Sequence, residues 1–245
     1  YDLGVQLFER TTRSTRLTWA GQVFLGEAHR VLSTLEQAIA STKAAATGYR
    51  GTLRIALSEG IAQPRLSSLL ARCREEEPDV EIRLFDVPLA EQVKGLRGGL
   101  FDAGLAHATD VGEGIVVQSV WSDPLVIAVP ARHPLLAHKR IPLAELIHYP
   151  LVLCHPEIYA GCYRQIERIL RTVDAEPVVA EYAATFDLMM TLVAAGYGLS
   201  FANESHMMVC RHPEVMARPL AGRPLMLTTY LLQPNTEPSE PLSRF

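Results

Sequence analysis

The sequence predicts an α/β protein of two lobes that is preceded by one unusually long amphipathic helix. From Thr18 to Ala46 there is no proline, and apolar residues recur at spacings of three and four. From Leu53 onward, segments typical of strands and helices alternate, which predicts a parallel sheet covered by helices. The alternation starts again after residue 131, so a second α/β unit follows the first. With 48% hydrophobic residues, the chain can bury a sizeable core.

The first stretch predicts a short hairpin that leads directly into the long helix. Segments 7–10 and 16–18 flank a polar turn at 11–15. Thr18 stands where an N-cap belongs, because its hydroxyl can accept a bond from an N–H of the first turn. A helix over 18–46 would be about 40 Å long and could not bury its apolar stripe against itself. We therefore expect a partner helix. The stripe consists of Leu17, Gly21, Phe24, Leu25, Ala28, Val31, Leu32, Leu35, Ala38, Ile39, Thr42 and Ala45.

The predicted organisation has three parts: a hairpin at 1–17, the helix at 18–47 and an α/β domain at 51–245. Gly48 and Gly51 mark a hinge before that domain. Its first unit reads as strand 53–57, helix 64–76, strand 80–85, helix 89–98 and strand 103–106. These elements predict a parallel β-α-β-α-β unit.

The second unit follows two further predicted strands, at 116–120 and 125–129, and a crossover at 130–134. It reads as strand 151–153, helix 162–173, strand 178–181, helix 187–195 and strand 199–201, with a last strand at 225–232. We expect lobe I to comprise about 51–130 plus 221–245, and lobe II about 131–220.

Charge and composition limit the classes of function. The net charge of −4 argues against a whole surface that binds nucleic acid. The basic signal is local, in the hairpin. Arginine can neutralise phosphate and threonine can hydrogen-bond to it, but three arginines in a loop are by themselves more often a solvated turn. With no run of 18 apolar residues, no signal-peptide pattern and four widely spaced cysteines, we expect a cytoplasmic protein with reduced thiols.

Two segments near the start, Leu3-Gly4-Val5-Gln6-Leu7-Phe8-Glu9-Arg10 and Arg16-Leu17-Thr18-Trp19-Ala20-Gly21, resemble the end of the winged helix-turn-helix of LysR-type transcriptional regulators, LGxxLFxR…xLTxAG. Segments 53–56, 77–80, 99–105 and 192–198 resemble later landmarks of the family, so the resemblance covers nearly the whole chain. It implies a periplasmic-binding-protein-like effector domain, a linker helix that pairs two subunits and a homotetramer. It also implies operator DNA and a small-molecule effector as partners, and beside the family pattern we expect DNA backbone contacts from Arg10, Thr12, Arg13 and Arg16. We expect no cofactor. The groove-reading helix would precede Tyr1.

The effector site follows from the fold. In two-lobed α/β proteins, ligands bind beyond the carboxyl ends of strands, where helix N-termini offer N–H groups to anions. The resemblance places the effector in the same cleft and favours a carboxylate. His107 stands where arginine is common in regulators of aromatic degradation, so a pH-sensitive cation would replace a permanent one. The expected effector-binding residues are Ser58, Glu59, Gly60, Ile61, Pro88, His107, His155, Cys162, Thr185 and Asp187.

Other classes of function stay open at this point. Cys162 opens a predicted helix, whose dipole can lower a thiol pKa, and 162–165 partly resembles the Cys-x-Arg-Gln context of peroxide-sensing family members. Their second cysteine lies downstream, whereas Cys154 lies upstream. A solute-binding receptor of similar fold would not need residues 8–46.

Catalytic and metal motifs are lacking in the sequence. There is no GxSxG, P-loop, HExxH or dinucleotide fingerprint, so we do not expect an enzyme. His206, Cys210 and His212 are close in sequence but have no second half-site, and we expect no metal.

Overall fold

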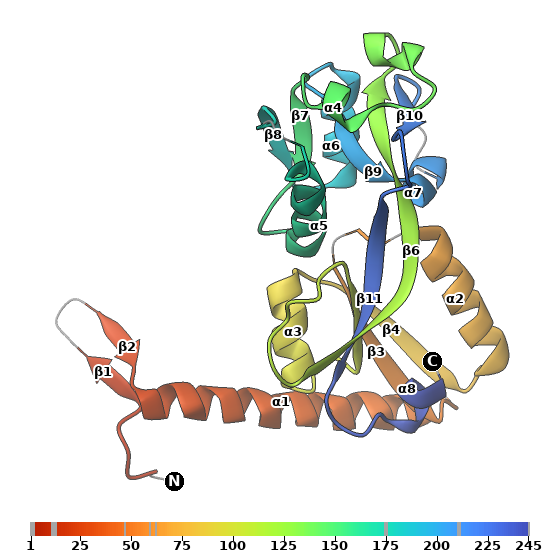
Figure 1. Ribbon diagram of the computed structural model, residues 1–245. Coiled ribbons are helices and arrows are strands. Elements are labelled where there is room, and N and C mark those ends of the chain that lie inside the picture. The colour runs from red at the N-terminus through yellow and green to blue at the C-terminus, as the bar shows by residue number, and fades with distance from the viewer. Residues whose placement is uncertain are drawn as a thin grey trace.

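The computed structural model describes residues 3–10, 14–46, 48–58, 60–61, 63–173, 176–209 and 212–244. Figure 1 shows helix α1, Trp19–Ala46, running beneath two stacked lobes, with a small hairpin projecting at its N-terminal end. Lobe I packs on the C-terminal half of α1, and lobe II lies on the far side of lobe I.

The hairpin is fixed to the start of α1. Strands β1 (Phe8–Arg10) and β2 (Thr15–Leu17) pair antiparallel. The Thr18 hydroxyl accepts a hydrogen bond from the Gly21 N–H (2.9 Å) and donates one to the Gln6 carbonyl (2.7 Å), so Thr18 is the predicted N-cap. A Cβ at Gly21 would collide with the Leu7 carbonyl oxygen, so only glycine allows this close approach.

The apolar stripe of α1 lies on the surface of the chain. Val31 is 67% exposed and Leu35 is 55% exposed. Single exposed apolar residues are common, but a contiguous stripe of this length is not. The other large apolar side chains exposed on the helix are Trp19, Val23, Phe24, Leu25, Leu32 and Ile39.

Lobe I follows the predicted β-α-β-α-β order, which is confirmed. Its elements are β3 (Gly51–Leu57), α2 (Gln63–Glu76), β4 (Val80–Asp86), α3 (Leu89–Arg97) and β5 (Ala103–Ala106). Strand β3 pairs in parallel with both β4 and β5. Arg54 of β3 and Asp102, the residue before β5, form a largely buried ion pair with an N–O distance of 2.7 Å.

The two lobes share two long strands. The sequence predicts two strands and a crossover at 130–134, but the structure has a single strand β6 (Ile115–Pro130). All of β11 (Met226–Pro234) pairs with it from Ile115 to Pro124. Beyond that point β6 pairs with β9 (Ser200–Asn203) and β10 (Val215–Pro219) in lobe II. The expected break is wrong because a proline inside a strand pattern usually marks its end, whereas this strand runs through Pro124.

Lobe II contains the remaining elements. They are η1 (Pro134–Ala137), α4 (Leu143–Leu146), β7 (Leu151–Cys154), α5 (Ala160–Leu170), β8 (Val179–Ala183), α6 (Phe186–Ala194), β9, α7 (Glu204–Val209) and β10. Strands β7 and β8 are parallel, and the core beneath them includes Ile127, Leu146 and Leu199. Helix α8 (Glu240–Arg244) returns to lobe I. Among the described residues, every helix is too short or too polar to span a membrane.

Candidate functional site

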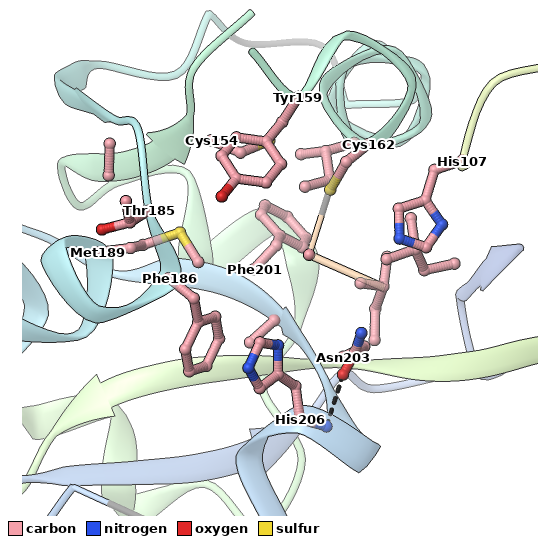
Figure 2. A pocket seen from close by; sticks show the side chains of 16 residues that line it. His107, Cys154, Tyr159, Cys162, Thr185, Phe186, Met189, Phe201, Asn203 and His206 are labelled. Carbon is pink, nitrogen blue, oxygen red and sulfur yellow. Dashed lines mark hydrogen bonds between the residues drawn. The ribbon is translucent and has the colours of Figure 1, made fainter. Parts of the chain in front are cut away.

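A cavity of about 50 Å³ lies where the lobes meet (Figure 2). Lobe I contributes Gly60, beyond the end of β3, and His107, directly after β5. The other lining residues come from the shared strands and lobe II: Leu125, Cys154, Tyr159, Cys162, Ile166, Ala183, Thr185, Phe186, Met189, Phe201, Ala202, Asn203, His206 and Leu227. An apolar cavity of roughly 150 Å³ can hold benzene, so a ring-sized ligand would require this cavity to open.

Most of the cavity wall is apolar, and none of the described residues that line it is Lys, Arg, Asp or Glu. The side chains with nitrogen or oxygen atoms are His107, Tyr159, Thr185, Asn203 and His206. An apolar wall with a few placed polar groups is typical of small-molecule sites.

Asn203 and His206 form the polar corner of the cavity. Asn203 ends β9 and precedes α7, and its side-chain oxygen Oδ1 accepts a hydrogen bond from the His206 N–H at 2.6 Å. The His206 ring stacks on Phe186, with ring centroids 3.8 Å apart and planes at 12° (Figure 2). Burial lowers the pKa of His206 and the nearby carboxylate of Asp187 partly opposes this shift. Near neutral pH the ring is therefore uncharged.

His107 and Gln165 connect the lobes beside the cavity. The His107 ring nitrogen Nδ1 lies 3.1 Å from the Thr228 carbonyl oxygen, and since a carbonyl only accepts, this nitrogen carries the proton. Gln165 of α5 donates through Nε2 to the carbonyls of His107 (2.6 Å) and Thr228 (2.9 Å). Helix α5, which also carries Cys162 and Ile166, is thus hydrogen-bonded to the residue after β5 of lobe I and to the shared strand β11.

Tyr159 covers the cavity from lobe II. Gly60 has a φ of +61°, which favours glycine, and a Cβ there would lie 3.6 Å from Cε1 of Tyr159. The Tyr159 ring therefore sits directly over the Gly60 backbone, across the junction of the lobes.

Four of the predicted effector-binding residues line the cavity: Gly60, His107, Cys162 and Thr185. Ser58 does not, because its buried hydroxyl donates to Oε1 of Gln92 in the interior of lobe I (3.2 Å). The Gln92 amide nitrogen in turn donates to the carbonyls of Ala56 and Leu105.

The remaining predicted residues lie elsewhere. Ile61 is part of the lobe I core, and Pro88 is an exposed residue before α3. His155 accepts a hydrogen bond from the Glu157 N–H at 3.3 Å, and Asp187 is exposed in the first turn of α6. Glu59 lies outside the described residues.

Sequence reasoning placed the site near the loop 154–162, which contains Tyr159, but it missed five further residues of the lobe II wall: Phe186, Met189, Phe201, Asn203 and His206. Helix α7 was not predicted, because six residues give no helical periodicity. The rule that ligands bind beyond strand ends could have found Asn203, since it is the last residue of β9.

The predicted DNA-contacting residues lie on the hairpin. Arg10 ends β1, Arg16 is paired with Glu9, and both arginines are exposed. Thr12 and Arg13 lie outside the described residues.

The cysteines and the histidines near residue 210 are the residues considered for redox sensing and for metal binding. Cys154 and Cys162 both line the cavity, and neither forms a disulfide. Within the described part of the chain, no group of three His, Cys, Asp or Glu side chains is placed to hold a metal, and Cys210 lies outside that part.

Two lobes that share crossing strands, with an apolar cavity between them, define a small-molecule receptor domain. Here this receptor domain is attached to a long helix with an exposed apolar stripe. The comparisons with known proteins specify the class further. Residues 46–245 match the LysR substrate binding domain. The chain belongs to the LysR family of transcriptional regulators.

Individual relatives agree with this assignment. The chain is 29% identical over 243 residues to the uncharacterised HTH-type transcriptional regulator YnfL of Escherichia coli K12, covering 99% of this chain and 82% of that protein. In fold it is similar to full-length CbnR in complex with its target DNA (TM-score 0.77, 24% identity, 99% of this chain and 82% of that one). It is also similar to the effector-binding domain of BenM with its effector benzoate (TM-score 0.71, 24% identity, 79% and 87%).

Proposed function

We propose that this chain senses a small metabolite in the cavity between its lobes and controls transcription from operator DNA in the cytoplasm. The observation that carries the proposal is that both lobes line the cavity: Gly60 and His107 lie on one side, and α5 and α6 on the other. A molecule bound there would contact both lobes at once. It would therefore favour one arrangement of the lobes over another.

The connection to DNA runs through lobe I and α1. Strand β3 of lobe I follows α1 after a short hinge and packs against it. A change in the position of lobe II relative to lobe I would alter how neighbouring subunits fit together, and hence how they hold DNA. The DNA complex of CbnR, which has the same fold, supports this part of the proposal.

Dimerisation through α1 accounts for its exposed apolar stripe. A second copy of the helix would cover Val31 and Leu35, which are more than half exposed in the single chain. Further pairing of such dimers would give the tetramer expected from the family resemblance. A solute-binding receptor has no use for this helix, so that alternative is disfavoured.

The hairpin would contact the DNA backbone. Arg10 and Arg16 are exposed on it, with Thr12 and Arg13 between them in the sequence. Contacts of this kind hold the protein on DNA without reading its sequence. Base recognition would come from the helix that precedes a wing in this family.

The charge of the cavity lining bears on whether the effector carries a carboxylate. The sequence favours a carboxylate, and the benzoate bound to BenM is one. However, the described lining residues include no permanent cation, and the only ionisable nitrogens among them belong to His107 and His206. A carboxylate-bearing effector therefore stays a prediction that the lining residues do not themselves support.

A ligand screen with a blocked cavity tests the proposal. Thermal-shift screening of small organic acids and amides should give compounds that stabilise the chain. Cys162→Phe, which fills the cavity, should abolish their effect. The matched variant Cys73→Phe, on α2 and away from the cavity, should leave it intact. Compounds that stabilise both variants equally would bind elsewhere and overturn the placement of the site.

A further inference from the structure

The amide group of Asn203 has an unused donor inside the effector cavity. Asn203 is 6% exposed and lines the cavity. Its oxygen Oδ1 accepts from the His206 N–H, so the amide nitrogen Nδ2 must lie on the opposite branch of the side chain. Figure 2 shows this nitrogen directed away from the His206 backbone, among the lining side chains. Among the described residues, no hydrogen bond from Nδ2 to another residue is present.

Helix capping alone does not explain an asparagine at this position. Asn203 precedes α7 and caps it through Oδ1, but Asp, Ser or Thr would cap equally well. Each of those residues would cap without leaving an NH₂ group in an apolar cavity. Among the described residues, the buried side-chain polar atom without a partner is Nε1 of Trp121, so the Nδ2 group of Asn203 is open to the cavity and can donate to a molecule that enters it.

The surroundings of Nδ2 define what that partner can be. Leu125 pairs with Asn203 across the strands β6 and β9, and Phe201 and Leu227 line the same cavity. Such a wall suits a compact apolar group with one hydrogen-bond acceptor. A buried carboxylate needs a charged partner or several donors, whereas a carbonyl oxygen is satisfied by one or two N–H groups. The lowered pKa of the neighbouring His206 removes the nearest candidate for a cation.

We propose that Asn203 determines the specificity of the cavity, by donating a hydrogen bond from Nδ2 to the carbonyl oxygen of an uncharged, compact effector. This inference rests on the proposed function, because it takes the cavity to be the effector site. The small volume, about 50 Å³, limits the end of the ligand that reaches Asn203 to a few non-hydrogen atoms in the present arrangement of the lobes. A larger remainder would extend toward Tyr159 and Gly60, where the lobes meet.

Matched amides and carboxylates provide the probes. Acetamide, isobutyramide and benzamide differ from acetate, isobutyrate and benzoate only in the group that would face Asn203. The readout is the NMR signal of methionine methyl groups labelled with ¹³C. The cavity residue Met189 reports binding, and Met208, which is 70% exposed, reports nonspecific effects. We expect at least one amide to shift Met189, with at least tenfold higher affinity than its matched carboxylate.

Variants at residue 203 separate capping from recognition. Asn203→Ser and Asn203→Asp both keep an oxygen that caps α7, so their unfolding temperatures should stay close to that of the wild type. Both remove the N–H donor. Asp puts in its place an acceptor that repels a carbonyl oxygen, and we expect it to weaken amide binding at least tenfold. Ser keeps a shorter O–H donor, so we expect a smaller loss. Asn235→Ser, at an exposed position, is the matched control and should bind amides like the wild type.

The outcomes distinguish the two proposals. If carboxylates shift Met189 and amides do not, the cavity is a ligand site but the chemistry assigned to Asn203 is wrong. If amides bind the Ser and Asp variants as tightly as the wild type, Asn203 does not recognise them. If no probe shifts Met189, the cavity does not take ligands of this kind. The inference about Asn203 and the placement of the effector then both fail.

Discussion

Gln165 of α5 and Thr228 of β11 exchange two hydrogen bonds across the junction of the lobes. The Thr228 N–H donates to Oε1 of Gln165 at 3.0 Å, and Nε2 of Gln165 donates to the Thr228 carbonyl at 2.9 Å. The side-chain amide of Gln165 thus offers Thr228 one acceptor and one donor, as the backbone of a neighbouring strand would. We call this pair of hydrogen bonds the interlobe tie. It lies directly beside the cavity, because Cys162 is one turn nearer the N-terminus of α5.

The substitution Gln165→Glu should loosen this tie. The variant side chain would keep one acceptor but would face the carbonyls of His107 and Thr228 with a carboxylate oxygen where an N–H had been. Leaving such partly buried groups without partners costs about 1–3 kcal/mol of unfolding free energy. Chemical denaturation should show this loss in Q165E but not in Q118E, which changes an exposed glutamine on β6. Equal stability of the two variants would show that the tie contributes nothing.

Helix α1 provides the second prediction. Val31→Asp or Leu35→Asp places a charge in the stripe that a partner helix would cover, so we expect monomers by multi-angle light scattering. Gly26→Asp adds the same charge on the opposite face of the helix, where an added side chain meets nothing within 4 Å, and should leave assembly unchanged. Assembly that survives both stripe variants would refute pairing through α1.

The fold could be predicted further from sequence than the site could. Hydrophobic periodicity located α1 and the elements of lobe I, because each is long enough for its period to show. Helix α7 and strand β10 have six and five residues, and periodicity did not find them. Pro124 suggested a break in β6, although the strand continues through it.

Only some of the predicted effector-binding residues line the cavity, because local sequence patterns do not show which side chains face it. Gly60 and His107 follow predicted strands, and both line the cavity. Ser58 follows the same strand as Gly60, but its hydroxyl is turned inward by Gln92, a contact 34 residues away that no local pattern reveals. Asn203 was missed because the predicted strand ends two residues before it. Tertiary contacts, rather than propensity, decide which residues at a strand end face a ligand.

The hairpin arginines should act on DNA affinity without affecting sequence preference. Arg10→Ala with Arg16→Ala removes two cationic side chains that are exposed on the hairpin. We expect weaker binding to every duplex and a salt dependence flatter by about one to two in log–log slope. Fluorescence anisotropy at several salt concentrations measures both, and Arg132→Ala in lobe II controls for the loss of charge. An unchanged slope in the double variant would remove the hairpin from the DNA interface.

The last prediction concerns pH and His206. Burial lowers the pKa of this ring in the folded chain below the ordinary value of 6.5. As the pH falls below 6.5, the unfolded chain takes up a proton that the folded chain does not, so folding stability falls until the lowered pKa is reached. Well above that pH both states are neutral at this residue, and the effect disappears. Burial lowers the pKa of His133 as well, so it adds a second contribution of the same sign.

His206→Gln should therefore reduce, but not abolish, the loss of unfolding temperature between about pH 7.5 and 5.5. The contribution of His133 remains in the variant. Differential scanning fluorimetry over this range measures the effect, and His29→Gln on the exposed surface of α1 is the matched control. The pH dependence of the control should follow that of the wild type. If the unfolding temperature of His206→Gln depends on pH as that of the wild type does, His206 binds protons equally in the folded and unfolded chain. The ring stacked on Phe186 is then not held neutral, and it does not help to exclude a carboxylate from the cavity.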